Sequence, residues 1–244
     1  MYSVAIAVAI GLLFGLGGWL LAWWSLFWVF VFTPIVMVVA WVVLVRLIGK
    51  RVMPMNIVVQ RQMEAGHVDA AMQSLRDMLR FANWMPLLRG QVMAQLGILN
   101  FHLGKHDEAE KLLLQSTRRA PEGQVILAVL HYRAGQKDRA FQTLQLAGVV
   151  NRGNSYLHNV RAWLLHKDGR VDEAIAALGH YLKKQAIDEQ AKENLLRLQN
   201  GKKPTMKSFG MPWYVLGFEQ PPPEMGQLRT HRKGFRTPPM RRGN

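Results

Sequence analysis

The first 45 residues of the chain form an apolar stretch that contains no Asp, Glu, Lys or Arg. As one helix, this stretch would extend ~68 Å, more than twice the ~30 Å hydrocarbon core of a bilayer, so one straight span does not fit. We therefore predict a transmembrane helical hairpin, with helices over 4–22 and 27–47 and a turn at 23–25. Tryptophans cluster around this turn, which is typical of a membrane interface. The alternative is a single span preceded by an interfacial segment.

Small residues recur every four positions in the first predicted helix. At this spacing they allow two helix backbones to approach closely in lipid. We expect this face to pack on the chain's own second helix, and homo-oligomerisation or docking to another membrane protein is the alternative. The membrane-packing residues are Ser3, Ala7, Gly11 and Gly15.

Positive charge follows the second apolar helix at Arg46, Lys50 and Arg51, whereas the predicted turn carries no charge. Because positive residues stay on the cytoplasmic side, we expect the rest of the chain and both termini to be cytoplasmic. A bacterial inner membrane is the expected location. These three side chains are expected to contact lipid headgroups.

After residue 51 the chain changes to amphipathic helices that share a short recurring word. Each copy places a Gly five residues before an Ala, with an Asp between them. The glycines, which lie 38, 31 and 34 residues apart, are Gly66, Gly104, Gly135 and Gly169. This period predicts an α-solenoid of helix pairs. We expect the Gly to adopt a left-handed turn, the Asp to cap the next helix, and the Ala to lie at a close helix crossing.

The second copy resembles the tetratricopeptide repeat (TPR). Its Leu96-Gly97, Ala109, Leu113 and Pro121 fall on positions of that motif, although Asn100 stands where an aromatic residue is usual. The resemblance implies an all-α domain over 52–201, with about four helix pairs and a capping helix over 188–199. In this family the first helix of each pair lines a concave groove that binds a partner protein or peptide.

Ten residues are expected on or near that groove, and Trp163 among them has the alternative role of a core residue. They are Gln91, Ile98, Phe101, His102, Tyr132, Arg133, Asn159, Trp163, His166 and Lys167.

The C-terminal segment, 202–244, carries nine basic and two acidic residues of a chain with net charge +15. Its aromatic stretch over 209–218 is too apolar to remain solvated without cost, so we expect it to bury itself against the chain's own helices, a partner or the bilayer. The basic end, with Arg232, Lys233 and Arg236, is expected to contact anionic lipid headgroups. A solvated tail is the alternative.

Catalytic chemistry has no evident carrier in this sequence. The chain has no Cys, and phosphate-loop and dinucleotide motifs are absent. His102 and His106 have metal-pair spacing, but Gly104 should interrupt the helix between them. We therefore expect no enzyme, no metal and no cofactor.

The combined pattern predicts a membrane-anchored adaptor or scaffold that recruits a partner protein, in envelope or membrane-complex assembly. The arrangement is similar to that of bacterial inner-membrane repeat proteins. The alternative is a membrane-tethered electrostatic module that docks RNA or ribosomes through the basic tail.

Overall fold

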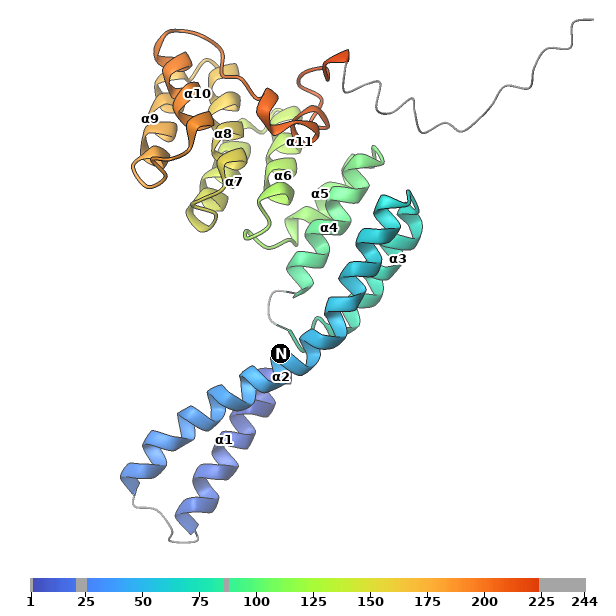
Figure 1. Cartoon of the computed structure of the whole chain (residues 1–244), viewed down its shortest axis with the longest axis vertical. Helices are drawn as coiled ribbons and strands as arrows, with labels where there is room; N and C mark the ends of the chain where they lie inside the picture. Colours follow the sequence, from blue (N-terminus) through green and yellow to red (C-terminus); the bar gives the residue numbers. More distant parts are fainter. Residues whose placement is uncertain (1, 21–25, 86–87, 224–244) are drawn as a thin grey trace, which may run out of the picture. The chain divides into compact units, whose positions relative to one another are not determined.

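The computed structural model describes residues 2–20, 26–85 and 88–223 (Figure 1). Within these ranges the chain is helical and has no strand, as predicted. Its contacts divide it into two units, Met1–Leu157 and His158–Asn244, and the division falls inside the helix Ser155–Lys167. The predicted turn at 23–25 and the tail residues Arg232, Lys233 and Arg236 lie outside the described residues.

The N-terminal unit begins with two apolar helices and continues with shorter helices joined by tight turns. The elements are α1 (Tyr2–Leu20), α2 (Leu26–Glu64), α3 (Val68–Met78), the 3-10 helix η1 (Leu79–Phe81), α4 (Leu88–His102), α5 (His106–Leu114), α6 (Pro121–Arg133) and α7 (Lys137–Val150).

The small-residue face of α1 packs directly against α2. A Cβ atom added to Gly11 would lie 2.2 Å from Met37 Cγ, and one added to Gly15 would lie 2.5 Å from Thr33 Oγ1. Both glycines, together with Ser3 and Ala7, are buried. Contact between these two helices therefore requires small side chains at these positions.

Helix α2 is long and apolar enough to cross a membrane, and it continues well beyond the expected end at residue 47. It runs through residue 51 without interruption and ends at Glu64. Its C-terminal part is buried at Val52 and Val59 in a core shared with α3 and α4. Tertiary packing of this face explains why the helix does not stop where the apolar stretch ends.

The four glycines of the recurring word adopt the left-handed backbone conformation that was predicted. Their φ angles are +78° at Gly66, Gly104 and Gly135, and +81° at Gly169. The alanine that follows each glycine by five residues is fully buried, at positions 71, 109, 140 and 174. These turns therefore reverse the chain, and the alanines allow the paired helices to approach closely.

The predicted capping role of the aspartates is wrong. The N-cap positions of α3, α5 and α7 are His67, Lys105 and Gln136, and none of their side chains makes a capping hydrogen bond. The aspartates lie instead at the second residue of each helix. There a carboxylate stabilises the helix through the positive end of its dipole.

The C-terminal unit contains the remainder of α8 (Ser155–Lys167), followed by α9 (Val171–Leu182) and α10 (Glu189–Gln199). Helix α10 begins and ends as predicted, since Asp188 accepts a hydrogen bond from the Ala191 N–H at 3.0 Å and Gly201, just beyond the helix, has φ +65°. Two short elements follow, η2 (Lys207–Phe209) and α11 (Met211–Tyr214).

Candidate functional site

A groove of 770 Å³ opens in the N-terminal unit between α2, α3, α4 and the start of α6. Its floor is apolar and includes Val59, Met78, Val92 and Leu99, which belong to or flank the core of this unit. The lining residues come mainly from the first helices of three successive pairs, namely the C-terminal part of α2, α4 and the start of α6. Figure 1 shows these helices in the N-terminal unit. An apolar groove between helices is one of the surfaces to which peptide segments bind.

Side-chain amides line two walls of the groove at helical spacing. Asn56 and Gln60 lie one turn apart on α2, and Gln91 and Gln95 lie one turn apart on α4; all four are exposed. Each amide offers both a hydrogen-bond donor and an acceptor, as a peptide group does. The groove therefore presents groups that match the main chain of an extended polypeptide.

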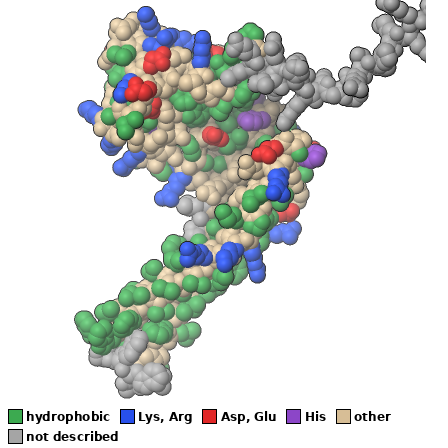
Figure 2. Space-filling view, viewed as in Figure 1, with side chains coloured by type: hydrophobic (Ala, Val, Ile, Leu, Met, Phe, Trp, Pro, Cys, Tyr) green, Lys and Arg blue, Asp and Glu red, His purple; other side chains and the backbone are tan. Residues whose placement is uncertain are grey.

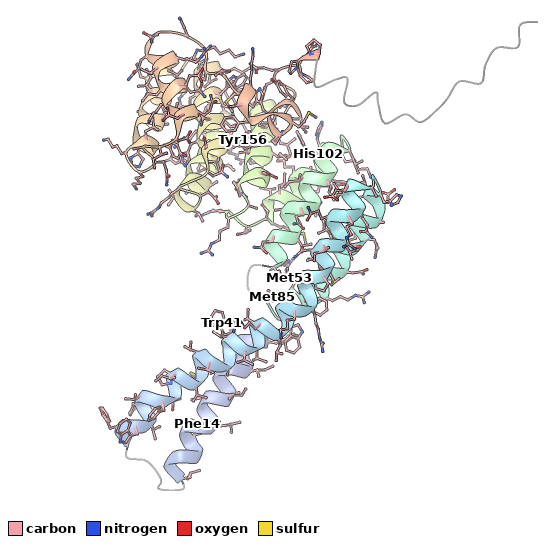
Figure 3. All side chains as sticks on the ribbon, viewed as in Figure 1. Phe14, Trp41, Met53, Met85, His102 and Tyr156 are labelled. Carbon is pink, nitrogen blue, oxygen red and sulfur yellow. The ribbon has the colours of Figure 1, made fainter. Side chains whose placement is uncertain are left out.

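Charged residues lie where α6 enters the groove. Arg119 and Glu122 are exposed lining residues, and Glu122 stands in the first turn of α6. Partial burial lowers the pKa of His102, and the Glu122 carboxylate partly opposes that shift. Burial raises the pKa of Tyr156, and Glu122 adds to the increase. Figure 3 shows His102 at the end of α4.

Only some of the predicted groove residues of the N-terminal unit line the groove. Gln91 and Ile98 line the groove. Phe101 is 4% exposed, with its ring centroid 5.2 Å from that of His106, so it is a core residue. Tyr132 is half-buried, and its ring packs edge-on against Phe141 with the centroids 6.2 Å apart.

The remaining predicted residues also fall into exposed and buried classes. Arg133 and Lys167 are exposed, and His166 is half-buried. Trp163 is 3% exposed, and its ring centroid lies 4.8 Å from that of Trp213 and 4.9 Å from that of Phe218. Trp163 therefore belongs to the core of the C-terminal unit, which was the alternative expectation, and its ring offers no surface to a partner.

Residues 203–219, which we call the C-terminal strap, fold back onto the helices of the C-terminal unit. The sequence left three burial places open for the aromatic stretch, and the structure buries it against the chain's own helices. Trp213 and Met206 are fully buried, and Leu216 is 1% exposed. The Trp213 Nε1–H donates to Glu219 Oε2 at 2.8 Å, and Glu219 also forms an ion pair with Lys203.

Asn194 of α10 holds both main-chain polar groups of one strap residue, Thr205. Its Oδ1 accepts from the Thr205 N–H at 2.7 Å, and its Nδ2 donates to the Thr205 carbonyl at 2.9 Å and to Asn159 Oδ1 at 2.8 Å. Both asparagines are fully buried. Asn159 therefore supports the strap and is not an accessible groove residue.

Asn56, Gln60 and Gln95 were missed as groove residues by the sequence argument. Their common signal was an amide every four residues on a helix face. That signal was obscured on α2 because the sequence argument divided this helix at residue 51. No protein-family model, curated protein or solved structure matches this chain. Among the described residues, no group of three or more His, Cys, Asp or Glu side chains is placed to hold a metal ion.

Proposed function

We propose that this chain is a membrane-anchored TPR-like adaptor. Helices α1 and α2 cross a bacterial inner membrane as a hairpin, with the helix pairs and both termini in the cytoplasm. The groove of the N-terminal unit binds an extended segment of a partner protein and holds it beside the membrane.

Membrane anchoring is supported by the surface of α1 and α2 (Figure 2). Leu13, Phe30 and Val38 are 71%, 75% and 59% exposed. Exposed apolar side chains that cover neighbouring helices mark a contact with lipid or protein. The exposed residues Arg46, Lys50 and Arg51 follow it on α2, as expected for the cytoplasmic end of a span.

The TPR-like assignment is supported by the local geometry of the helix pairs. The left-handed glycine and the buried alanine recur in every copy of the word. In the second pair, a Cβ atom at Gly97 would lie 2.6 Å from Leu113 Cγ, so the Leu-Gly position of the motif marks a close helix contact. These are the packing requirements of a solenoid of paired helices.

Peptide binding rests on one observation above the others, namely four exposed amides that surround an apolar floor in a groove of 770 Å³. The amides satisfy main-chain groups, and Ile98 with the floor residues accepts apolar side chains. Arg119 and Glu122 add one charge of each sign at one end. A partner segment with alternating apolar and polar residues fits this lining.

Site-specific photo-crosslinking in intact cells tests this proposal. A benzophenone amino acid at Gln95 should capture one protein partner, whereas the same group at Glu108, an exposed position on α5 outside the groove, should not. Equal capture at both positions would show that the groove is not the binding surface.

Docking of RNA or ribosomes through residues 202–244 has less support. Lys203, one of its basic residues, is engaged with Glu219 inside the strap. Binding that falls steeply with salt and disappears on deletion of residues 220–244 would favour this alternative over the adaptor.

A further inference from the structure

The start of α1 is attached to the loop that follows η1. The Tyr2 N–H donates to the Asn83 carbonyl at 2.8 Å, and Ser3 Oγ donates to the Trp84 carbonyl at 2.5 Å. The rings of Tyr2 and Trp84 meet edge-on with their centroids 5.4 Å apart. A loop far along the sequence is thereby fixed at the beginning of the apolar helix pair.

The register of α1 on α2 gives the depth of this loop. Gly11 faces Met37, and Gly15 faces Thr33, so the helices are antiparallel and the numbers of facing residues add to 48 in both cases. Extending this register brings Tyr2 level with Arg46, the first charged residue of the chain. Tyr2, Arg46 and Trp84 therefore stand at the level where the apolar stretch ends.

The side chains of this loop have the chemistry of a membrane interface. Trp84 is half-buried, and an indole next to a tyrosine is the pairing that collects at headgroup depth. The Arg80 side chain is 79% exposed, and its guanidinium contacts Asp77 at 3.2 Å while solvent reaches the rest of it. No acidic residue precedes Glu64 in the sequence, so α2 contributes only positive charge at this level.

We propose that the segment Arg80–Met85, which runs from η1 into the following loop, is a third membrane contact in addition to the two spans. Trp84 lies in the interfacial region beside Tyr2, and Arg80 binds the phosphates of anionic lipids in the cytoplasmic leaflet. This proposal rests on the proposed anchoring of α1 and α2 and adds to it a fixed orientation of the first helix pair.

The loop contact also sets the height of the groove. Asn56, the first amide of the groove, follows Arg46 by ten residues on the same helix, a rise of about 15 Å. A ligand in the groove therefore lies within a short distance of the headgroups. The occupant that fits is a polypeptide segment adjacent to a membrane span or bound at the membrane surface.

The absence of cysteine allows the loop to be tested with single labels on the full chain. The variants Asn83→Cys, Val39→Cys and His67→Cys place an environment-sensitive nitrobenzoxadiazole dye on the loop, on the exposed apolar surface of α2, and next to the Gly66 turn. All three positions are exposed. The protein is reconstituted in vesicles of phosphatidylcholine, with or without 30% phosphatidylglycerol.

The label at residue 83 should be quenched by nitroxides attached to lipid headgroups, the label at 39 by nitroxides on the acyl chains, and the label at 67 by neither. Quenching at 83 should increase with phosphatidylglycerol, and Arg80→Gln should abolish that increase, whereas Arg152→Gln, at another exposed arginine, should not. If lipid nitroxides do not quench the label at 83 but quench the label at 39 normally, the loop contact alone is overturned. If they quench neither label, the proposed anchoring is overturned. An increase that survives Arg80→Gln would overturn the role of Arg80.

Discussion

Replacement of Trp213 by alanine should release the C-terminal strap. The indole ring is fully buried, lies 4.8 Å from Trp163 between ring centroids, and donates its N–H to Glu219 at 2.8 Å. The hydrogen bond to Glu219 lies within the strap, so the attachment to the helices comes from the burial of the ring and its contact with Trp163 of α8. Replacement by alanine removes this attachment.

The magnitude follows from the buried surface. A tryptophan buries about 150 to 250 Å², which at ~25 cal/mol per Å² corresponds to about 4 to 6 kcal/mol. Measured truncations of buried Trp to Ala cost about 3 to 5 kcal/mol. The strap can detach without unfolding the helices, so the cost is limited by the net docking free energy of the strap. Conformational entropy of ~1 to 2 kcal/mol per ordered residue keeps that net value small.

Hydrogen exchange of the full chain in nanodiscs measures this release. The Thr205 N–H, bound to Asn194 at 2.7 Å, and the Leu216 N–H, bound to the Trp213 carbonyl at 3.0 Å, report on opening of the strap. In Trp213→Ala their protection should fall by roughly 10² to 10³-fold, or to the value of an open chain if docking is weaker than that. Amides of α9 should change little.

Met211→Ala is the matched control, because Met211 belongs to the same short helix but is 43% exposed. It should change the protection by less than about 0.5 kcal/mol. Protection of Thr205 and Leu216 in Trp213→Ala that equals that of the unmodified protein would refute the assignment of Trp213 as the attachment of the strap.

Four further predictions concern the helix pairs. Trp163→Ala should cost about 3 to 5 kcal/mol of the unfolding free energy, because the ring is in the core; thermal unfolding that is unchanged would contradict this. Gly97→Val should cost ~1 to 3 kcal/mol through overpacking against Leu113, whereas Gly104→Val should cost ~1 to 3 kcal/mol through backbone strain alone, since the space around Gly104 is open. Restoring space with Leu113→Ala should rescue part of the first effect; a variant pair that shows no such coupling would argue against direct contact. Burial lowers the pKa of His131 below 6.5 despite the Glu110 carboxylate. As the pH decreases, the unfolded state therefore binds the proton first, and the free energy of unfolding should fall below about pH 6.5. His131→Gln should flatten that decrease in urea titrations at pH 5 to 7.

The local geometry of the turns could be predicted from the sequence because glycine and alanine each meet one specific steric requirement there. A residue with φ near +78° favours glycine, and a fully buried crossing of two helices favours alanine. The small-residue face of α1 was predictable for the same reason. The aspartate caps were not, because the helix begins one residue before each Asp, and helix ends cannot be read from composition to that accuracy.

The candidate site was only partly predictable. Phe101 and Trp163 were expected on the groove because they lie on the first helix of a pair, but such a helix contacts neighbours on several sides, and helical periodicity does not separate a concave surface from a core. The burial of Trp163 depends on the strap, a contact with residues about 50 positions away that no local pattern encodes. The amides of α2 required knowing that this helix continues to Glu64.

The affinity of a partner segment for the groove tests the central proposal most directly. The segment is the one that crosslinks to position 95, and the receptor is the full chain in nanodiscs. Gln91→Ala combined with Gln95→Ala removes two amides, each worth about 0.5 to 1.5 kcal/mol, so binding should weaken by roughly 5- to 150-fold. The pair Glu108→Ala and Lys111→Ala on α5, outside the groove, should leave it unchanged. Equal affinity of the groove variant and the unmodified protein would contradict the account.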